Sequence, residues 1–187
     1  MNKETYRASS DEFLVNASLQ GDEEAFEALV NRYKKLVART VKGMLGDSVY
    51  SEDIGQEVFI KLYYSLSEFR GDAKLSTYIQ KIAVNLTLNE LKRRKRFFSL
   101  FTYKADNELH EYDIAGEDIE NKHDAKAAVE KALKTLEPKF RIVVAMRMLQ
   151  GYSTKETAKI LDLPIGTVLS RLSRAQEQLR KYLTNDE

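Results

Sequence analysis

Apolar residues recur every three or four positions along most of this 187-residue chain. That spacing gathers them on one face of an α-helix, whereas the strict alternation of apolar and polar residues that marks a β-strand is absent. Long stretches contain no helix breaker, because the chain has only two prolines, Pro138 and Pro164. The pattern therefore predicts an all-α protein.

The first half of the chain contains four predicted helices. A short helix around residues 13–19 ends at Gly21, and Asp22 is a good N-cap for a second helix that ends at Gly46. A third helix follows, and a fourth runs from about residue 73 to 97. Residues expected to face a common core in these helices are Phe13, Leu14, Leu19, Leu29, Tyr33, Val37, Val41, Met44, Ile54, Val58, Leu62, Leu66, Leu75, Ile79, Ala83 and Leu86.

The second half predicts four more helices, and the last two form a pair of a special kind. A helix covers residues 127–136, and Pro138 stands at the first turn of the next, which stops at Gly151. Ser153 and Glu156 have the spacing of a capping box and open a short third helix. After a tight connection at residues 162–166, the last helix begins at Thr167 and turns one apolar face inward, formed by Val168, Leu172, Ala175 and Leu179.

The opposite face of the last helix is polar and cationic, and it carries Thr167, Ser170, Arg171 and Arg174. A short helix, a tight turn and a helix with such a face fit a helix-turn-helix whose second helix enters the major groove of DNA. Arginine can contact guanine edges or phosphates there, and hydroxyl groups can contact phosphates. The alternative is an ordinary helical hairpin with solvated arginines.

Composition removes several classes of protein. The chain has no cysteine, which excludes disulfide scaffolds and thiolate metal sites, and only two histidines. The longest apolar run, residues 142–146, is far shorter than the roughly 20 residues that cross a bilayer. The first residues lead into no apolar signal core, so we expect a cytoplasmic protein without membrane insertion. We expect no metal and no cofactor.

The net charge of +1 hides a strong segregation of charge along the chain. Residues 71–104 carry 8 cations and 2 acids, and residues 139–182 carry 9 cations and 3 acids. Residues 105–124 carry 8 acids and 1 cation. The two basic blocks predict binding to a polyanion, although a solvated helix face of one sign is the alternative for either block alone. The acidic stretch, at residues 100–124, predicts a flexible linker between domains at residues 1–99 and 125–187.

Three stretches resemble the extracytoplasmic-function (ECF) group of bacterial RNA polymerase sigma factors, in the sigma-70 family. Residues 52–59 are similar to the segment that docks on a coiled coil of the largest polymerase subunit. Residues 69–85 are similar to the segment that captures and opens the minus-ten promoter element. Residues 133–138 and 152–175 are similar to the reader of the minus-thirty-five element. The order and spacing of the stretches also match.

This resemblance implies an all-α fold with two four-helix sigma domains, domain 2 and domain 4, which are joined by the acidic linker. It implies core RNA polymerase, promoter DNA and an anti-sigma factor as partners, and no enzymatic activity. The implied polymerase-binding residues are Asp53, Gln56, Glu57 and Phe59. The residues implied to bind and melt the minus-ten element are Phe69, Arg70, Asp72, Lys74, Tyr78, Lys81, Asn85, Lys92, Arg93 and Arg94. Those implied to read the minus-thirty-five element are Thr167, Ser170, Arg171 and Arg174.

The chain departs from the family pattern at three positions. Tyr78 stands where the family usually has Trp, and its ring still offers a surface for base stacking. Leu169 and Gln176 stand where basic residues are common, which predicts fewer phosphate contacts and a shallower salt dependence.

Asp53, Gln56 and Glu57 share one helix face, whereas Ile54 and Val58 point to the core. An acidic and amide face can pair with arginines of a partner. One alternative is a carboxylate metal site for phosphodiester cleavage, which needs further ligands. Another alternative is a stand-alone helix-turn-helix regulator, which leaves the first domain unexplained.

Overall fold

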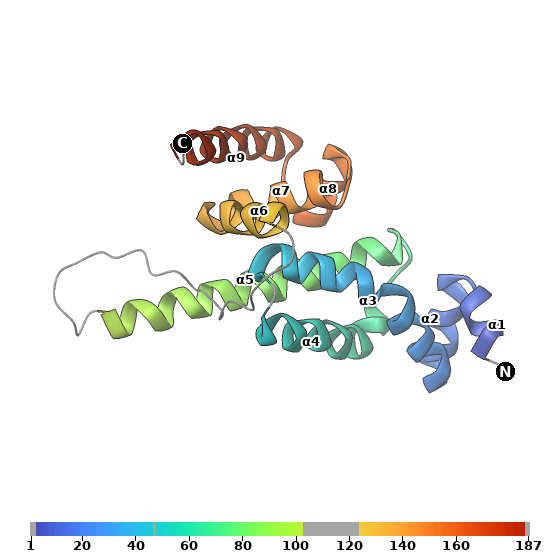
Figure 1. Cartoon of the computed structure of the whole chain (residues 1–187). Coiled ribbons are helices and arrows are strands. Elements are labelled where there is room, and N and C mark those ends of the chain that lie inside the picture. Colours follow the sequence, from blue (N-terminus) through green and yellow to red (C-terminus); the bar gives the residue numbers. More distant parts are fainter. Residues whose placement is uncertain (1–2, 47, 103–123, 186–187) are drawn as a thin grey trace.

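The structure is a computed structural model that describes residues 3–46, 48–102 and 124–185. Within these ranges the chain forms helices and no strand (Figure 1), so the predicted all-α class is confirmed. The N-terminal half comprises α1 (Lys3–Ala8), α2 (Asp11–Leu19), α3 (Glu23–Leu45), α4 (Val49–Ser65), the 3-10 turn η1 (Leu66–Glu68) and α5 (Leu75–Thr102). The C-terminal half comprises α6 (Asp124–Thr135), α7 (Pro138–Val144), the π-helical turn η2 (Ala145–Leu149), α8 (Thr154–Leu161) and α9 (Ile165–Asn185).

The core of the N-terminal half lies between α3, α4 and α5, which pack on one another along their lengths. The predicted inward residues of these helices are buried or partly buried, as the helical spacing required. The inward face predicted for the short helix around residues 13–19 is only partly right, because Leu14 is buried whereas Phe13 and Leu19 are exposed. Asp22 caps α3 by accepting a 3.1 Å hydrogen bond from the Ala25 amide, as predicted.

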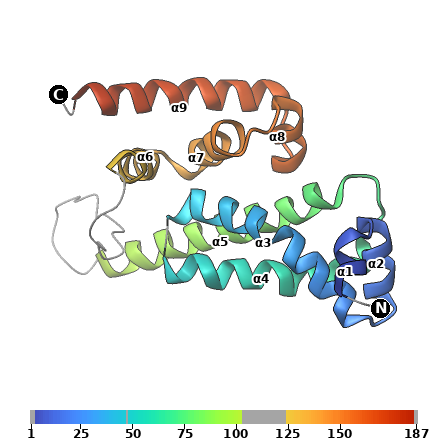
Figure 2. The ribbon, with the colours of Figure 1, turned by 45° about the vertical axis from the view of Figure 1, so that its right-hand side comes forward.

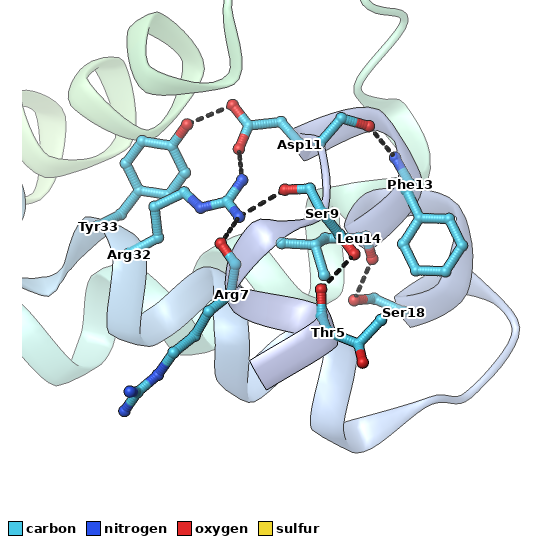
Figure 3. A network of polar contacts seen from close by, with 10 residues as sticks. Thr5, Arg7, Ser9, Asp11, Phe13, Leu14, Ser18, Arg32 and Tyr33 are labelled. Atoms are coloured by element: carbon cyan, nitrogen blue, oxygen red, sulfur yellow. Dashed lines mark hydrogen bonds and ion pairs between the residues drawn. The ribbon is translucent and has the colours of Figure 1, made fainter. Parts of the chain in front are cut away.

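The first helix, α1, was not predicted, and a polar network ties it and α2 to α3 (Figure 3). The Arg32 guanidinium donates to Asp11 at 2.6 Å and to the backbone oxygens of Ser9 and Arg7 at 2.6 and 3.1 Å. The Tyr33 hydroxyl also donates to the Asp11 carboxylate, and burial together with this bond raises the pKa of Tyr33. The network fixes the two short helices against the N-terminal half of α3.

The C-terminal half has a smaller core of its own, in which α7 packs on α9. Its buried residues are Leu133, Leu136, Phe140, Val144 and Ala175. Pro138 begins α7, as predicted. Helix α7 continues directly into η2, where a π-helical turn replaces the last turn of regular α-helix.

The two halves also pack against each other. A third buried cluster joins Met44 of α3 and Val84 of α5 to Ile142, Val143 and Met146 of the C-terminal half. The contacts run from α3 to α7 and η2, and from α5 to α7 and α8. Figure 2 shows the consequence: α6, α7 and α8 lie between α9 and the layer formed by α3 and α5.

The boundaries of the predicted linker shift in the structure. The helix predicted to end near residue 97 runs to Thr102, and the next helix begins at Asp124. The remaining part of the acidic stretch, residues 103–123, lies outside the described residues, and so does its predicted flexibility.

Candidate functional site

The face of α4 that was expected to bind the polymerase points to solvent. Asp53, Gln56 and Glu57 are exposed, while Ile54 and Val58 are buried in the core. This division follows from the helical spacing alone. The fourth predicted residue, Phe59, differs from the other three because it is half-buried and packs against the core of the N-terminal half.

The same face of α4 continues into an apolar patch that the sequence reasoning missed. Ile60, Tyr63 and Tyr64 are 57%, 52% and 78% exposed. The Tyr63 ring lies edge-on to Phe26, with ring centroids 5.0 Å apart, and Tyr64 extends the cluster. The signal was available, because positions 53, 57, 60 and 64 fall on one side of a helix. Exposed aromatic residues beside carboxylates are typical of a protein-binding surface.

An open hollow of about 420 Å³ lies between α4 and α5. It brings Asp53 and Glu57, which were expected to bind the polymerase, next to Arg93, which was expected to bind DNA. The residues that line it are Tyr50, Asp53, Ile54, Glu57, Leu86, Asn89, Glu90 and Arg93.

The turn before α5 presents the first group of residues expected to contact the minus-ten element. Arg70, Asp72 and Lys74 are exposed there. Phe69 and Tyr78 are half-buried, with ring centroids 5.3 Å apart, and the Tyr78 hydroxyl donates to the Ser65 backbone oxygen at 3.1 Å. The two rings thus form the floor of the turn, and the charged groups form its rim.

Further along α5, three residues expected to line the DNA strand follow one side of the helix. Lys81 is half-buried, and Asn85 and Lys92 are exposed. Their spacing of four and seven residues continues the line that starts at Lys74. The line gives α5 a polar and cationic face that neither core occupies.

The basic run at the end of α5 is organised by an acid that the sequence reasoning did not single out. Glu90 is 7% exposed and accepts bonds from Arg93 Nε at 2.7 Å and from Arg94 Nε at 2.8 Å. The hydrogen bond from Arg93 is the main cause that lowers the pKa of Glu90. The Arg93 side chain is still 71% exposed, whereas that of Arg94 is 15% exposed.

Arg94 is also held from its other side. Its guanidinium carbon lies 4.1 Å from the centroid of the Tyr50 ring. An arginine that is paired and stacked in this way links α5 to α4. Among the predicted phosphate contacts, Arg93 is therefore accessible, as Lys92 is, and Arg94 is largely engaged within the protein.

The predicted helix-turn-helix corresponds to α8, a short turn and α9. The capping box is present: Ser153 N donates to Glu156 Oε2 at 2.9 Å, and Glu156 N donates to Ser153 Oγ at 3.2 Å. Hydrogen bonds from the Ser153 side chain and from the Ser153 backbone lower the pKa of Glu156, and the charge of Lys74 adds a smaller contribution. Asp162 ends α8 in the left-handed conformation, with φ 52°.

The recognition helix starts earlier than the sequence suggested. It begins at Ile165 and not at Thr167, because the Pro164 carbonyl already accepts the first helical bonds. Val168 and Ala175 are fully buried, as predicted. Among the residues expected to read DNA, Ser170 and Arg174 are exposed, and Thr167 and Arg171 are half-buried.

Within residues 3–46, 48–102 and 124–185, no three carboxylate or histidine side chains converge in a way that holds a metal ion. In the same ranges, no helix combines the length and the apolar character that crossing a membrane requires.

The structure combines a helix-turn-helix, a cationic helix face and an acidic helix face. This combination is typical of helical DNA-binding proteins that also dock on another protein. Comparison with known proteins narrows this class. Residues 29–97 match the family described as Sigma-70 region 2, and residues 126–179 match Sigma-70, region 4.

Full-length relatives give the same result. RNA polymerase sigma-H factor of Pseudomonas aeruginosa is 33% identical over 180 residues, which cover 92% of this chain and 93% of that protein. ECF RNA polymerase sigma-E factor of Escherichia coli K12 is 35% identical over 181 residues, which cover 91% of this chain and 92% of that protein. The chain belongs to the ECF sigma factors of the sigma-70 family.

The fold is also that of a solved sigma factor. RpoE of Bartonella quintana, in a co-crystal structure with the anti-sigma factor NepR, aligns with a TM-score of 0.65 and 20% identity. The alignment covers 87% of this chain and 98% of that chain, so the likeness includes both halves.

Proposed function

We propose that the chain binds core RNA polymerase and directs it to promoters, where it reads the minus-thirty-five element and opens the minus-ten element. One observation carries this function furthest: the three groups of residues implied by the family resemblance occupy three surfaces of one folded chain, two of which meet at the hollow between α4 and α5. These surfaces are the solvent face of α4, the turn and outer face of α5, and the start of α9.

The polymerase would dock on α4. Asp53, Gln56 and Glu57 offer carboxylate and amide oxygens to cationic side chains of a partner helix. The exposed side chains of Tyr63 and Tyr64, about two turns further on, add apolar area, which polar pairs alone lack. Phe59, being half-buried, acts by positioning α4 and not by direct contact.

Promoter opening needs binding energy and no covalent step. Unstacking a base and holding it outside the duplex takes a few kcal/mol. The floor formed by Phe69 and Tyr78 offers rings for stacking, and Lys74, Lys81 and Lys92 offer charge to the separated strand. The chain therefore acts as a binding protein and not as an enzyme, and its place of action is the cytoplasm.

The minus-thirty-five element would be read by α9. Arg174 and Ser170 are the accessible members of the predicted group, and Arg171 is half-buried on the same side. The Ser170 hydroxyl already donates to the Thr167 carbonyl at 3.1 Å, which leaves its oxygen as an acceptor. Arginine is therefore the main reader of bases and phosphates on this helix.

An anti-sigma factor is the expected regulator, as in the complex formed by the Bartonella quintana relative. Exposed apolar side chains on α4 and at the end of η2, such as Tyr64 and Met148, offer it surface.

Retention of core polymerase by the immobilised chain tests the docking surface. The double variant Gln56→Ala, Glu57→Ala should retain at least ten-fold less polymerase than the wild type. Glu24→Ala, which removes an exposed acid from α3 and not from α4, serves as the control and should leave retention within two-fold. Equal retention by all three proteins contradicts docking through α4.

A further inference from the structure

Two exposed apolar side chains stand at the start of α9, beside the residues that were expected to read DNA. Ile165 and Leu169 are 46% and 52% exposed, and their spacing of four residues places them one above the other on the helix. Among the described residues, neither is a member of the three buried clusters that hold the fold together. Ile165 and Leu169 therefore form an apolar edge that faces water.

The apolar edge lies across α9 from the arginines. At about 100° per residue, Ile165 and Leu169 fall on one flank of the helix, whereas Arg171 and Arg174 fall on the other. Ser170, which is exposed, stands between the two flanks. In a helix-turn-helix, the N-terminal residues of the second helix contact the base edges. Both flanks of α9 therefore belong to the surface that enters the major groove.

Gly166 lies next to the apolar edge, and the fold itself does not require a glycine there. Its φ is not positive, and a Cβ built on it would meet no atom of the described residues within 4 Å. A glycine inside a helix also lowers stability, because it loses more backbone entropy on folding than other residues do. Glycine at such a position suits a surface that another molecule approaches closely. This observation indicates a ligand at the start of α9.

The charge around the apolar edge favours nucleic acid as its occupant. Residues 154–176 carry four cations and two acids. Lys155 and Lys159 on α8 and Arg174 on α9 are exposed, whereas the acid Glu156 is bonded to Ser153 in the capping box. Phosphates line both sides of the major groove, so a DNA duplex matches an apolar edge that is bordered by cations.

The chemistry of the base edges decides what an apolar side chain can read. In the major groove, guanine presents two acceptors, adenine an acceptor and a donor, and cytosine a donor, whereas thymine adds a methyl group to its acceptor. A leucine side chain offers no hydrogen bond, so it removes water from a polar edge without replacing it. The thymine methyl is the apolar group that the four base edges offer there.

We propose that Leu169 determines specificity by packing on the methyl group of a thymine in the minus-thirty-five element, and that Ile165 extends this contact. The inference deepens the proposed function and rests on it. A basic residue, which is common in the family at position 169, binds any phosphate, whereas leucine favours one base. Arg174 on the other flank supplies the charge that holds α9 on the duplex.

Uracil provides the test, because it pairs as thymine does but lacks the 5-methyl group. The probes are duplex promoter fragments that core polymerase transcribes only with the chain, and each thymine of the minus-thirty-five element is replaced by uracil in turn. At one position at least, the complex of chain and core polymerase should bind the uracil form about four-fold more weakly, which is the effect of one buried methylene-sized group. With Leu169→Ala, the same replacement should weaken binding less than two-fold.

Two control variants on the same helix separate this effect from others. Leu183→Ala removes a side chain that is 57% exposed near the far end of α9, and it should keep the four-fold sensitivity to uracil. Arg174→Ala should weaken binding to the thymine and uracil forms equally, because it removes a charge and not a methyl contact. Leu169 is exposed, so thermal melting of Leu169→Ala should match that of the wild type.

Three results overturn the inference. The first is wild-type protein that binds every uracil form as tightly as the thymine form. The second is a Leu169→Ala variant with full sensitivity to uracil, since another group then reads the methyl. The third is a loss of core polymerase retention in Leu169→Ala, which marks the apolar edge as a protein contact. If no promoter fragment depends on the chain for transcription, the proposed function itself is wrong.

Two further variants at the same position test the chemistry of the contact. Leu169→Met keeps an apolar side chain of similar size and should keep the sensitivity to uracil. Leu169→Lys should lose this sensitivity and should steepen the slope of log affinity against log salt by about 0.9, because it adds a phosphate contact. A Leu169→Lys variant that still distinguishes thymine from uracil contradicts the inference.

Discussion

Glu90 Oε1 accepts a 2.8 Å hydrogen bond from Arg94 Nε, and this pair lies at the point where α5 meets α4. The Tyr50 ring covers the same guanidinium. The run of five cations from Lys92 to Arg96 is therefore not uniform, since one member is held inside the protein by an acid of its own helix. This distinction leads to predictions that separate stability from DNA binding.

Removing the acid should destabilise the N-terminal half. In Glu90→Gln the side chain keeps its shape but loses its charge, so Arg94 keeps a weaker partner in a nearly buried position. We expect the free energy of unfolding to fall by about 1 kcal/mol. Urea denaturation followed by circular dichroism measures the change. Glu52→Gln, at an exposed position of α4, should change stability by less than about 0.5 kcal/mol.

Glu90 also predicts a dependence of stability on pH. The folded protein lowers the pKa of Glu90, chiefly through its bond with Arg93. The carboxylate therefore stabilises the fold above its ordinary pKa of 4.5, and this stabilisation is lost as the pH falls through the lowered value. The difference in unfolding midpoint between wild type and Glu90→Gln should be constant near neutral pH and should shrink below pH 4.5. A difference that grows in acid contradicts this assignment.

Salt dependence should distinguish exposed from engaged cations. Lys92 is exposed, so Lys92→Ala should reduce the slope of log affinity against log salt by about 0.7–0.9 for the complex of chain, polymerase and promoter. Arg94→Ala should leave the slope unchanged and should lower thermal stability instead. Filter binding over a series of salt concentrations gives both slopes. An equal change of slope in Arg94→Ala and Lys92→Ala would contradict the distinction between an exposed and an engaged cation.

Tyr78 should act in promoter opening mainly through its ring. Tyr78→Phe loses the bond to the Ser65 carbonyl, which should lower stability by about 1 kcal/mol, yet it keeps the stacking surface beside Phe69. Tyr78→Ala removes the ring and should abolish most of the opening. Reactivity of unpaired thymines toward permanganate reports the open complex. Equal opening by the Phe and Ala variants contradicts a stacking role.

Much of the fold followed from local rules in the sequence. The stripe on α4, the cap at Asp22 and the capping box at Ser153 each depend on residues within one or two turns, so spacing alone predicted them. The polar face of α9 followed in the same way. The predicted start of α9 was two residues too late. The first helical hydrogen bonds are accepted by the Pro164 backbone carbonyl, and no capping side chain in the sequence signals this start.

The features that the sequence did not reveal depend on contacts between distant segments. Gln80 and Gln150 are 70 residues apart and resemble ordinary solvated amides until the fold brings them together. The bond from Arg32 to Asp11 and the burial of Glu90 are of the same kind. Apolar periodicity locates the buried face of a helix, but it does not say which polar residue pairs with which.

Transcription of fragmented genomic DNA by core polymerase, with and without the chain, tests the central claim most directly when the 5′ ends of the transcripts are sequenced. The account predicts a set of start sites that appear only with the chain and share sequence elements near positions −10 and −35. These starts should disappear with the Gln56→Ala, Glu57→Ala double variant. Start sites that are the same with and without the chain would contradict the claim.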